Sequence, residues 1–245
     1  MRIGIVGCAG RMGRTLVLTV LETPGADLAG GLEATGHPLI GSDVASAAGA
    51  AACGRGITGD AAALFASADT VIDFSTPAAL IEHAALAAAS GASMVVGTTG
   101  LSEVHTAALQ QAASKVAVVH APNMSVGVNL LLGLTRQVAA ILGSDYDIEI
   151  VEMHHRHKVD APSGTALALG EAAAAGRGVA LVDVAVRSRD GHTGARPPGA
   201  IGFATLRGGD VVGEHTVMFA AEGESIALTH KATSRAVFAR GAVRA

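Results

Sequence analysis

Apolar and polar residues follow each other along the first 120 residues in a way that predicts strands and helices in turn. Short, largely apolar runs are expected to be buried strands, and they cover residues 2–6, 27–32, 70–74, 94–96 and 116–120. Longer segments with a helical pattern are expected to be helices, and they cover residues 14–22, 77–90 and 102–114. Strands that alternate with helices predict βαβ units and a parallel sheet.

This pattern changes after Ala121-Pro122-Asn123. One long apolar helix is expected over 126–142, followed by an alternating strand over 146–153 and a second helix over 165–175. Further strand-like runs follow at 181–187, 203–207, 211–220 and 224–232. Successive strands with short turns predict a mixed or antiparallel sheet.

The change of pattern predicts two domains. We expect an α/β domain over 1–125, a smaller α+β domain over 126–233, and a helix over 234–245 that returns to the first domain. The segment 188–202 carries four Gly and two Pro with little apolar pattern, so we expect a mobile loop, with a lid as one role for it.

Composition narrows the class of protein. Half of the 245 residues are hydrophobic, but only 2% are aromatic, so the core must consist of small aliphatic residues and Gly. The net charge of -4 argues against a broad nucleic-acid surface. Two cysteines make neither a disulfide framework nor a zinc signature, which indicates a reduced protein.

The mean hydropathy of +0.45 raises the question of membrane insertion. The apolar stretches are interrupted by Gly, Asp, His or Ser, and none is expected to reach the roughly 18–20 apolar residues of a membrane span. The chain opens directly into a strand, without the apolar stretch and cleavage site of a signal peptide. We therefore expect a cytoplasmic protein with neither a membrane nor a nucleic-acid partner.

A glycine-rich turn follows the first strand. Gly7-x-x-Gly10-x-x-Gly13 is a variant of the dinucleotide fingerprint, in which glycines permit a tight turn and close approach of the backbone to a pyrophosphate. Glu33 ends the next strand, 20 residues after Gly13, the spacing of a carboxylate that binds a ribose hydroxyl. The pattern predicts a Rossmann domain with a nicotinamide dinucleotide, and the alternative is a Rossmann-like domain without one.

The residue after Glu33 bears on the choice of cofactor. Ala34 stands there, so no arginine offsets the repulsion between the carboxylate and a 2′-phosphate. This favours NADH, while Arg11 or the 34–42 loop leaves NADPH open as a second cofactor.

Cationic and acid/base side chains are concentrated in one run. Three histidines, an arginine and a lysine fill positions 154–158, and the turn Pro162-Ser163-Gly164-Thr165 then opens a helix. The first N–H groups of a helix bind carboxylates or phosphates, and a histidine exchanges protons near neutral pH. A metal site is disfavoured, because neighbouring histidines on a strand point to opposite faces and no further ligand set is present. A solvated basic turn explains one or two of these residues but not all five, so the run predicts a site for a small anionic substrate.

The chain resembles the 4-hydroxy-tetrahydrodipicolinate reductase (dihydrodipicolinate reductase) family. The run from Glu152 to Leu167 is specific to that family. Shorter motifs continue the likeness in the family's order, at Gly7–Gly13, Asp73–Pro77, Gly97–Gly100, Ala121–Asn129, Arg189–Gly194, Ile201–Thr205, Gly213–Thr216 and Thr229–Lys231.

The resemblance implies a fold, a reaction and residue roles. It implies a Rossmann domain, a substrate domain whose sheet builds a homotetramer, and the NAD(P)H-dependent reduction of a cyclic dicarboxylate in diaminopimelate and lysine biosynthesis. His154 would be the proton donor/acceptor and Lys158 the proton donor, while His155, Gly164 and Thr165 would bind the substrate carboxylates. The cofactor would contact Gly7, Cys8, Ala9, Gly10, Arg11, Met12, Glu33, Gly97, Thr98, Thr99, Ala121, Pro122, Asn123 and Met124. For Arg156 and His157 the resemblance implies no role, and we expect structural hydrogen bonds.

The chain departs from the family's pattern at two places. Many members have an arginine where Ala34 stands, and many continue beyond the last residue, Ala245, with a longer helix and tail. Two other functions stay open at this point: a related Rossmann dehydrogenase for another cyclic imino or amino dicarboxylate, and a nucleotide-sensing protein without turnover. The His154–Lys158 pair speaks against the sensor.

Overall fold

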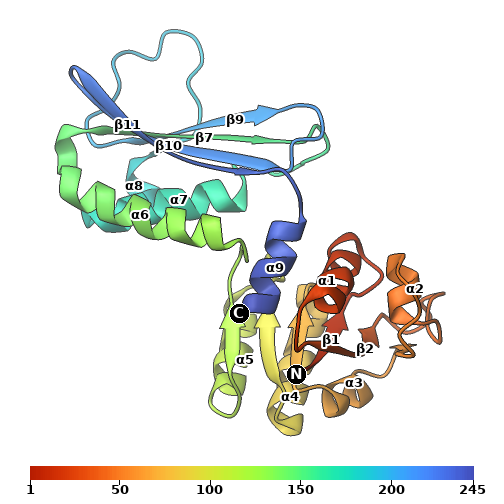
Figure 1. Cartoon of the computed structure of the whole chain (residues 1–245). Coiled ribbons are helices and arrows are strands. Elements are labelled where there is room, and N and C mark those ends of the chain that lie inside the picture. Colours follow the sequence, from red (N-terminus) through yellow and green to blue (C-terminus); the bar gives the residue numbers. More distant parts are fainter. The chain divides into compact units, whose positions relative to one another are not determined.

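A computed structural model describes all 245 residues, and their contacts divide the chain into two compact units. Unit 1 comprises Met1–Ser125 together with Arg235–Ala245, and unit 2 comprises Val126–Ser234 (Figure 1). Unit 2 is therefore a single continuous segment, whereas unit 1 is built from the two ends of the chain.

Unit 1 contains a parallel sheet with the strand order β3-β2-β1-β4-β5-β6. Its strands are β1 (Arg2–Val6), β2 (Asp27–Leu32), β3 (Ile57–Thr58), β4 (Thr70–Asp73), β5 (Ser93–Val96) and β6 (Val118–His120). The order runs outward in both directions from β1 and β4, and ligands of such sheets bind at the carboxyl ends of the strands where the order reverses. The parallel sheet expected from the sequence is confirmed.

Helices cover both faces of this sheet. They are α1 (Arg11–Glu22), α2 (Val44–Ala48), α3 (Ala61–Ser67), α4 (Pro77–Ser90), α5 (Glu103–Ala113) and α9 (Ala236–Arg244). The alternation of side chains along β1 divides the core between the two faces. Ile3 and Ile5 pack with α1 and α9, while Val6 packs with residues of α3, α4 and α5.

The last helix, α9, packs against α1 within unit 1 (Figure 1). Its buried Ala239 and Ala242 join the cluster that contains Leu16 of α1. A Cβ atom at Gly241 would lie 1.7 Å from the carbonyl oxygen of Met124, so the helix approaches that backbone as closely as only glycine permits.

Unit 2 contains a mixed sheet with the order β11-β10-β7-β9-β8, as the sequence predicts. Its strands are β7 (Asp147–His154), β8 (Ala185–Val186), β9 (Ile201–Arg207), β10 (Gly213–Ala221) and β11 (Glu224–Ala232). β9 pairs in parallel with β7 and β8, whereas β10 pairs antiparallel with β7 and β11. The helices of the unit are α6 (Val126–Leu142), α7 (Gly164–Arg177) and α8 (Leu181–Val184).

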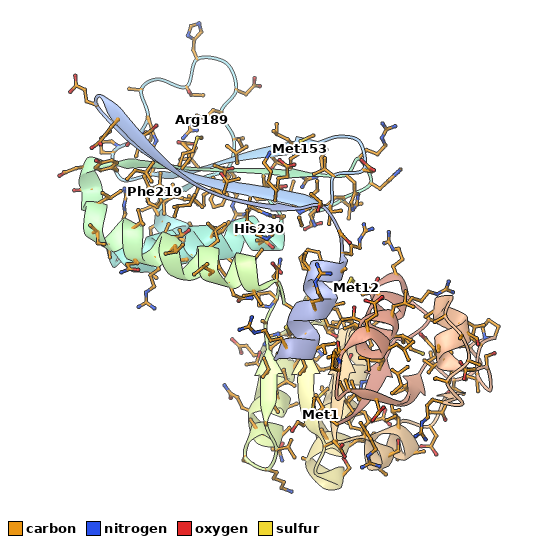
Figure 2. The ribbon with its side chains drawn as sticks, in the orientation of Figure 1. Met1, Met12, Met153, Arg189, Phe219 and His230 are labelled. Carbon is orange, nitrogen blue, oxygen red and sulfur yellow. The ribbon has the colours of Figure 1, made fainter.

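Helices α6 and α7 cover one face of this sheet and leave the other open (Figure 1). Ile148 and Ile150 of β7 point to the covered face, where they pack with Leu169 of α7 and Phe219 of β10. Figure 2 shows the side chains that fill the space between the sheet and these helices. Glu152 continues the row of Ile148 and Ile150, so the covered face runs directly into the histidine-rich run.

One expectation about a short element is wrong. The run 181–187 is not one strand, because it begins with the helical turn α8 and has only two strand residues, Ala185 and Val186. Leu181 is 4% exposed and Val182 is 85% exposed, while Val184 joins Leu181 at the core, a spacing of three that suits a helical turn. Between 34 and 69, where no element was expected, the structure contains α2, β3 and α3. Asp43 and Asp60 cap the two helices.

The segment between β8 and β9 has no helix and no strand, and it extends from the sheet on the side away from α6 and α7 (Figure 1). Arg189, labelled in Figure 2, and Arg196 both donate hydrogen bonds to Glu149 of β7. The base of the loop is thus tied to the strand by ion pairs, and its role as a lid stays a prediction.

One segment, Val126–Asp145, has the length and composition of a membrane span, with a mean hydropathy of 1.5. The expectation that no segment reaches this length is therefore wrong for these 20 residues. A single helix of this kind is weak evidence, because core helices share these properties, and here Leu131 and Ala139 pack in the core of unit 2.

Gly13→Ala is expected to destabilise the protein. The added Cβ would lie 2.0 Å from the carbonyl oxygen of Gly7 and 2.6 Å from the Cα of Cys8, and both atoms belong to the backbone. Forcing α1 away from the turn should cost about 3 kcal/mol or more. Gly133→Ala, in open space on α6, is the matched control and should stabilise by about 0.5–1 kcal/mol. Urea unfolding followed by circular dichroism measures both, and equal midpoints for the two variants would contradict the packing argument.

Candidate active site

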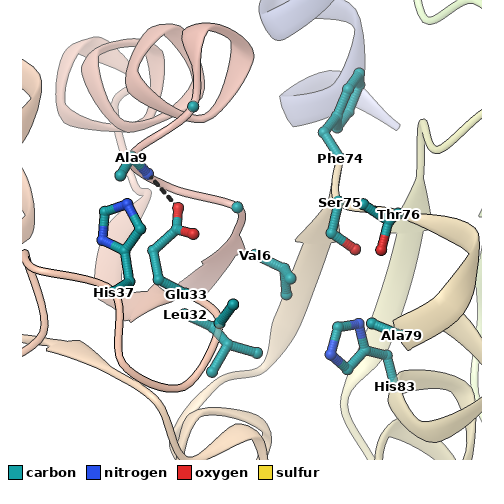
Figure 3. A pocket seen from close by; sticks show the side chains of 13 residues that line it. Val6, Ala9, Leu32, Glu33, His37, Phe74, Ser75, Thr76, Ala79 and His83 are labelled. Atoms are coloured by element: carbon teal, nitrogen blue, oxygen red, sulfur yellow. Dashed lines mark hydrogen bonds between the residues drawn. The ribbon is translucent and has the colours of Figure 1, made fainter.

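A pocket of about 450 Å³ opens in unit 1 at the carboxyl ends of β1, β2 and β4 (Figure 3). These are the strands at which the order of the sheet reverses, the usual place for a nucleotide. Its lining comes from the glycine turn, from the end of β2 and from the start of α4: Val6, Gly7, Ala9, Gly10, Leu32, Glu33, Ala34, His37, Phe74, Ser75, Thr76, Ala79 and His83.

The glycine turn has the form of a phosphate cradle. Gly7 adopts a left-handed conformation with φ of 71°, and its carbonyl accepts a hydrogen bond from the N–H of Gly10. Gly10 is the N-cap of α1 but has no side chain to cap the helix, in contrast to Ser163 at the start of α7. The first N–H groups of α1 therefore have no capping side chain, and the helix dipole favours an anion there. These residues fit the pyrophosphate of a dinucleotide.

Glu33 lies across this turn, at the end of β2. Its Oε1 accepts a hydrogen bond of 2.7 Å from the N–H of Ala9, drawn as a dashed line in Figure 3. Ala34 and His37 line the same side of the pocket, and Figure 3 shows the His37 ring beside Glu33. The carboxylate is thus held at the edge of the pocket, where a ribose would meet it.

The structure does not bring all expected cofactor residues to this pocket. Gly7, Ala9, Gly10 and Glu33 line it. The other expected residues do not line it, and these are Cys8, Arg11, Met12, Gly97, Thr98, Thr99, Ala121, Pro122, Asn123 and Met124. Cys8 points into the core, where burial and the nearby Glu33 raise the pKa of its thiol to about 12.

The turn between β4 and α4 also contributes to the pocket, although no role was expected for it. Phe74, Ser75, Thr76 and His83 line the pocket opposite Glu33 (Figure 3). Pro77 at the first position of α4, directly after a buried strand, is the sequence signal that locates this turn. The carboxylate of Asp73 fixes the position of this turn.

Asp73 is fully buried at the end of β4. It accepts hydrogen bonds from the N–H and hydroxyl of Ser75 at 2.9 and 2.6 Å, and its Oδ2 lies 2.7 Å from Nδ1 of His83. Thr98 contributes a fourth donor at 3.3 Å. Burial raises the pKa of Asp73, but the hydrogen bonds from His83 and Ser75 outweigh it, so the pKa lies below its usual value.

Unit 2 holds the second group of expected site residues, at the end of β7. His154 is the last residue of that strand, and its Nδ1 lies 2.5 Å from Oε2 of Glu152. Burial lowers the pKa of His154 below its usual 6.5, Glu152 acts in the opposite direction, and Lys158 and Arg207 lower the pKa further. The ring is therefore neutral at pH 7 and available to accept a proton.

Lys158 lies in the turn that follows β7. Its N–H donates to the carbonyl of His155, and its Nζ forms an ion pair of 2.7 Å with Oδ1 of Asp160. Burial raises the pKa of Asp160, but Lys158, a backbone hydrogen bond and the charge of Arg207 together lower it below its usual value, so the carboxylate stays charged at neutral pH. Arg156 and His157 are exposed, and the N–H of Arg156 donates to the carbonyl of Gly209.

The start of α7 has the form of an anion site. Ser163 is buried and accepts a hydrogen bond from the N–H of Ala166, so its hydroxyl serves as the helix cap. Gly164 and Thr165 are the first two residues of the helix, and Gly164 is exposed. Their N–H groups precede the first intrahelical donors and are suited to a carboxylate.

Three further residues join this group, although no role was expected for them. Arg207 of β9 forms ion pairs with Glu152, while His215 of β10 lies 3.0 Å from the hydroxyl of Ser163 and packs edge-on against His154. Glu152 itself was quoted only as the start of the histidine-rich run. No group of three or more His, Cys, Asp or Glu is arranged to hold a metal ion.

The buried His215 should make the stability of the protein depend on pH. Burial and the neighbouring His154 lower its pKa from 6.5 to about 4. The folded protein keeps this ring neutral while the unfolded chain takes up a proton, so its contribution is complete above pH 6.5 and is lost as the pH falls towards 4. The loss between pH 7 and pH 5 should be about 2 kcal/mol.

His215→Gln isolates this contribution, because glutamine retains a hydrogen-bonding group toward Ser163 but does not titrate. Urea midpoints of the wild type and the variant at pH 7 and pH 5 measure the difference. Equal pH dependence of the two proteins would contradict a neutral, buried His215.

Comparisons with known proteins match nearly the whole chain. A family model described as "Dihydrodipicolinate reductase, N-terminus" matches residues 1–124, and one described as "Dihydrodipicolinate reductase, C-terminus" matches residues 127–245. The 4-hydroxy-tetrahydrodipicolinate reductase of Ruegeria sp. (strain TM1040) is 57% identical over 99% of this chain and 90% of its own length. The enzyme of the same name from Parvibaculum lavamentivorans is 58% identical over 100% of this chain and 91% of its own length.

Solved structures agree with the fold. A dipicolinate-bound dihydrodipicolinate reductase from Paenisporosarcina sp. TG-14 superimposes with a TM-score of 0.75 at 26% identity, covering 99% of this chain and 92% of that chain. GenD2 from gentamicin A biosynthesis, solved in complex with NAD, has a TM-score of 0.56 at 17% identity, covering 94% of this chain and 72% of that chain, and shows the fold alone. Since the family models together match nearly every residue, the chain belongs to the dihydrodipicolinate reductase family.

Proposed function

We propose that this protein is an NAD(P)H-dependent oxidoreductase that reduces 4-hydroxy-tetrahydrodipicolinate to tetrahydrodipicolinate in diaminopimelate and lysine biosynthesis. The observation that carries the proposal is the site at the end of β7. There a neutral histidine ends the strand and a lysine lies in the turn that follows, directly before a helix start suited to a carboxylate. Family membership and the names of the relatives support the same reaction.

The dicarboxylate would be held by unit 2. The N–H groups of Gly164 and Thr165 and the side chain of His155 would bind its carboxylates, and the dipole of α7 favours that charge. His154 would exchange a proton through Nε2, because its Nδ1 is occupied by Glu152. Lys158, aligned by Asp160, would donate the proton that completes the reduction.

The cofactor would be held by unit 1, in the pocket around Glu33 and the glycine turn. A nicotinamide dinucleotide supplies the hydride, and the protein supplies the proton that the reduction also consumes. We further propose that the expected residues outside the pocket, Gly97–Thr99 and Ala121–Met124, contact other parts of the same cofactor. NADH is the preferred form in this proposal, because Glu33 is followed by Ala34.

The second unit would also form a homotetramer through the open face of its sheet. Leu206 and Met218 are 48% and 36% exposed on that face, where Val151 and Met153 also lie, so an apolar surface is available to another subunit. We propose a cytoplasmic location, which both free cysteines support, and neither a nucleic-acid nor a membrane partner.

The reaction is tested by NADH and NADPH oxidation at 340 nm with freshly made cyclic substrate. His154→Ala and Lys158→Ala are each expected to lose on the order of 10²–10⁴-fold in kcat, since each removes a placed proton-transfer group. NADH binding, measured by fluorescence, should be retained, because both residues lie in unit 2. Absence of turnover with either cofactor would refute the reaction and favour the related dehydrogenase or the nucleotide sensor, and a wild-type rate in either variant would refute that residue's role.

The cofactor preference has its own test, Ala34→Arg. A guanidinium at this position would pair with a 2′-phosphate beside Glu33, so kcat/KM for NADPH relative to NADH should rise about tenfold or more. Ala34→Gln, which is polar but uncharged, is the control and should leave the ratio within about threefold of the wild type. An unchanged ratio in Ala34→Arg would show that the preference is set elsewhere, with His37 the nearest candidate in the pocket.

A further inference from the structure

We propose that Arg207, acting through Glu152, is a positioning residue that fixes the tautomer of His154 and the place of Lys158. This inference rests on the proposed function, which assigns proton transfer to those two residues. Arg207 itself is not placed against the substrate. It acts on the reaction by holding the groups that do exchange protons.

Glu152 is the centre of this arrangement. The residue is 1% exposed and lies on the covered face of the sheet, in a row with Ile148 and Ile150. A carboxylate removed from water in this way must be paired and hydrogen-bonded to remain charged. Arg207 binds it in a bidentate manner, with Nη1 2.8 Å from Oε2 and Nη2 2.9 Å from Oε1. The N–H of Ser163 donates to Oε1 at 3.0 Å.

The charged Glu152 determines which nitrogen of His154 carries the proton. A carboxylate accepts but does not donate, so Nδ1 of His154, 2.5 Å away, must be the donor. Nε2 is then free to accept a proton. A Cβ atom at Gly213 would lie 3.0 Å from Nε2, so the glycine leaves room beside this nitrogen that any other residue would take.

Removal of Arg207 would change this state in a defined direction. Without the guanidinium, the buried pair of Glu152 and His154 would hold one proton more at neutral pH. The extra proton has two places, on the imidazole or on the carboxyl group, and Nε2 carries hydrogen in both cases. An imidazolium is protonated on both nitrogens, and a protonated Glu152 would donate to Nδ1 and leave the ring hydrogen on Nε2.

His154 has four charged or titratable neighbours, Glu152, Lys158, Arg207 and His215. Glu152 raises the pKa of the ring, while Lys158 and Arg207 lower it. His215, from β10, packs edge-on against the ring with the centroids 5.1 Å apart and is neutral at pH 7. Of the two cations, Arg207 is the one bound to Glu152, so it sets the charge state of the pair.

Arg207 also ties down the turn that carries Lys158. Its Nη2 donates to the carbonyl of Asp160 at 2.6 Å, and the Asp160 carboxylate in turn holds Nζ of Lys158 at 2.7 Å. Arg207 and His154 are cross-strand partners in the parallel pairing of β9 with β7. One guanidinium therefore links the strand end that carries the histidine with the turn that carries the lysine.

Unit 2 contains a second ion-pair network that serves as a matched control. Glu149 lies on the same strand as Glu152 but points to the opposite face, where Arg189 and Arg196 bind it. It has no histidine partner among its hydrogen bonds. Glu149→Gln removes a carboxylate of similar pairing without touching His154.

The test compares Arg207→Met, Arg207→Lys and Glu149→Gln with the wild type. Diethyl pyrocarbonate acylates an unprotonated imidazole nitrogen, and mass spectrometry of the peptide that contains His154 gives its modification rate as a function of pH. In the wild type, the modification rate of His154 should titrate with a midpoint below pH 6.5. Arg207→Met should move this titration upward by about one pH unit or more, which is the range expected when a paired charge is removed. Glu149→Gln should keep the wild-type titration.

Kinetics supply the second readout. Arg207→Met should lose on the order of 10²-fold in kcat, as the loss of general acid–base catalysis predicts. In the plot of kcat/KM against pH, the limb that reflects protonation of His154 should move to higher pH. The affinity for NADH should stay unchanged. Arg207→Lys keeps the charge but not the two-pronged contact, so it should restore the position of the limb and only part of kcat.

The outcomes separate this proposal from the proposed function. A wild-type titration of His154 in a folded Arg207→Met would overturn the proposal, and if that variant does not fold, the same result in Arg207→Lys combined with full kcat would overturn it. The acylation experiment needs no substrate. An absence of turnover in the wild type would therefore refute the proposed reaction, while the position of the His154 titration still decides the role of Arg207.

Discussion

A carboxylate without access to water controls the geometry of unit 2. Glu152 continues a row of buried isoleucines, and charge in that position persists only because a guanidinium, a backbone N–H and an imidazole surround it. Each of these partners comes from a different element: β9, the start of α7 and the end of β7 itself. The requirement to satisfy one desolvated charge thus draws together the segments from which the site is made.

In unit 1, close packing of the backbone determines the geometry of the pocket. Its parallel sheet brings the strand ends to one edge, and the glycine turn must fit between β1, α1 and the turn that follows β4. Gly7 supplies the left-handed conformation, while Gly13 permits helix and turn to touch. The pocket beside Glu33 is what remains when the backbone is packed this closely, and the uncapped start of α1 gives it an affinity for anions.

Those parts of the fold and of the candidate site that produce a local sequence pattern could be predicted from the sequence. Apolar runs and alternation locate the long strands and helices, and the fingerprint of glycines with Glu33 locates the pocket, because these signals act over a few residues. No such local signal predicts the roles of Arg207 and His215. They reach the site from strands 50 or more residues away, and only the sheet pairing brings them to Glu152. The apolar run at 181–187 suits a buried strand, but it suits a helical turn equally well, because Leu181 and Val184 are three residues apart and both pack in the core. The prediction of a strand there was wrong for this reason.

The packing of α9 fixes the order in which the chain can fold as it is synthesised. The core of unit 1 includes Ala239 and Ala242, which leave the ribosome after every residue of unit 2. Unit 2 is continuous in sequence and can close its own core first. The nucleotide-binding half, although its sheet is made at the start of translation, must therefore wait for the end of the chain, and a nascent chain that stalls within unit 2 leaves the face of α1 that meets α9 uncovered.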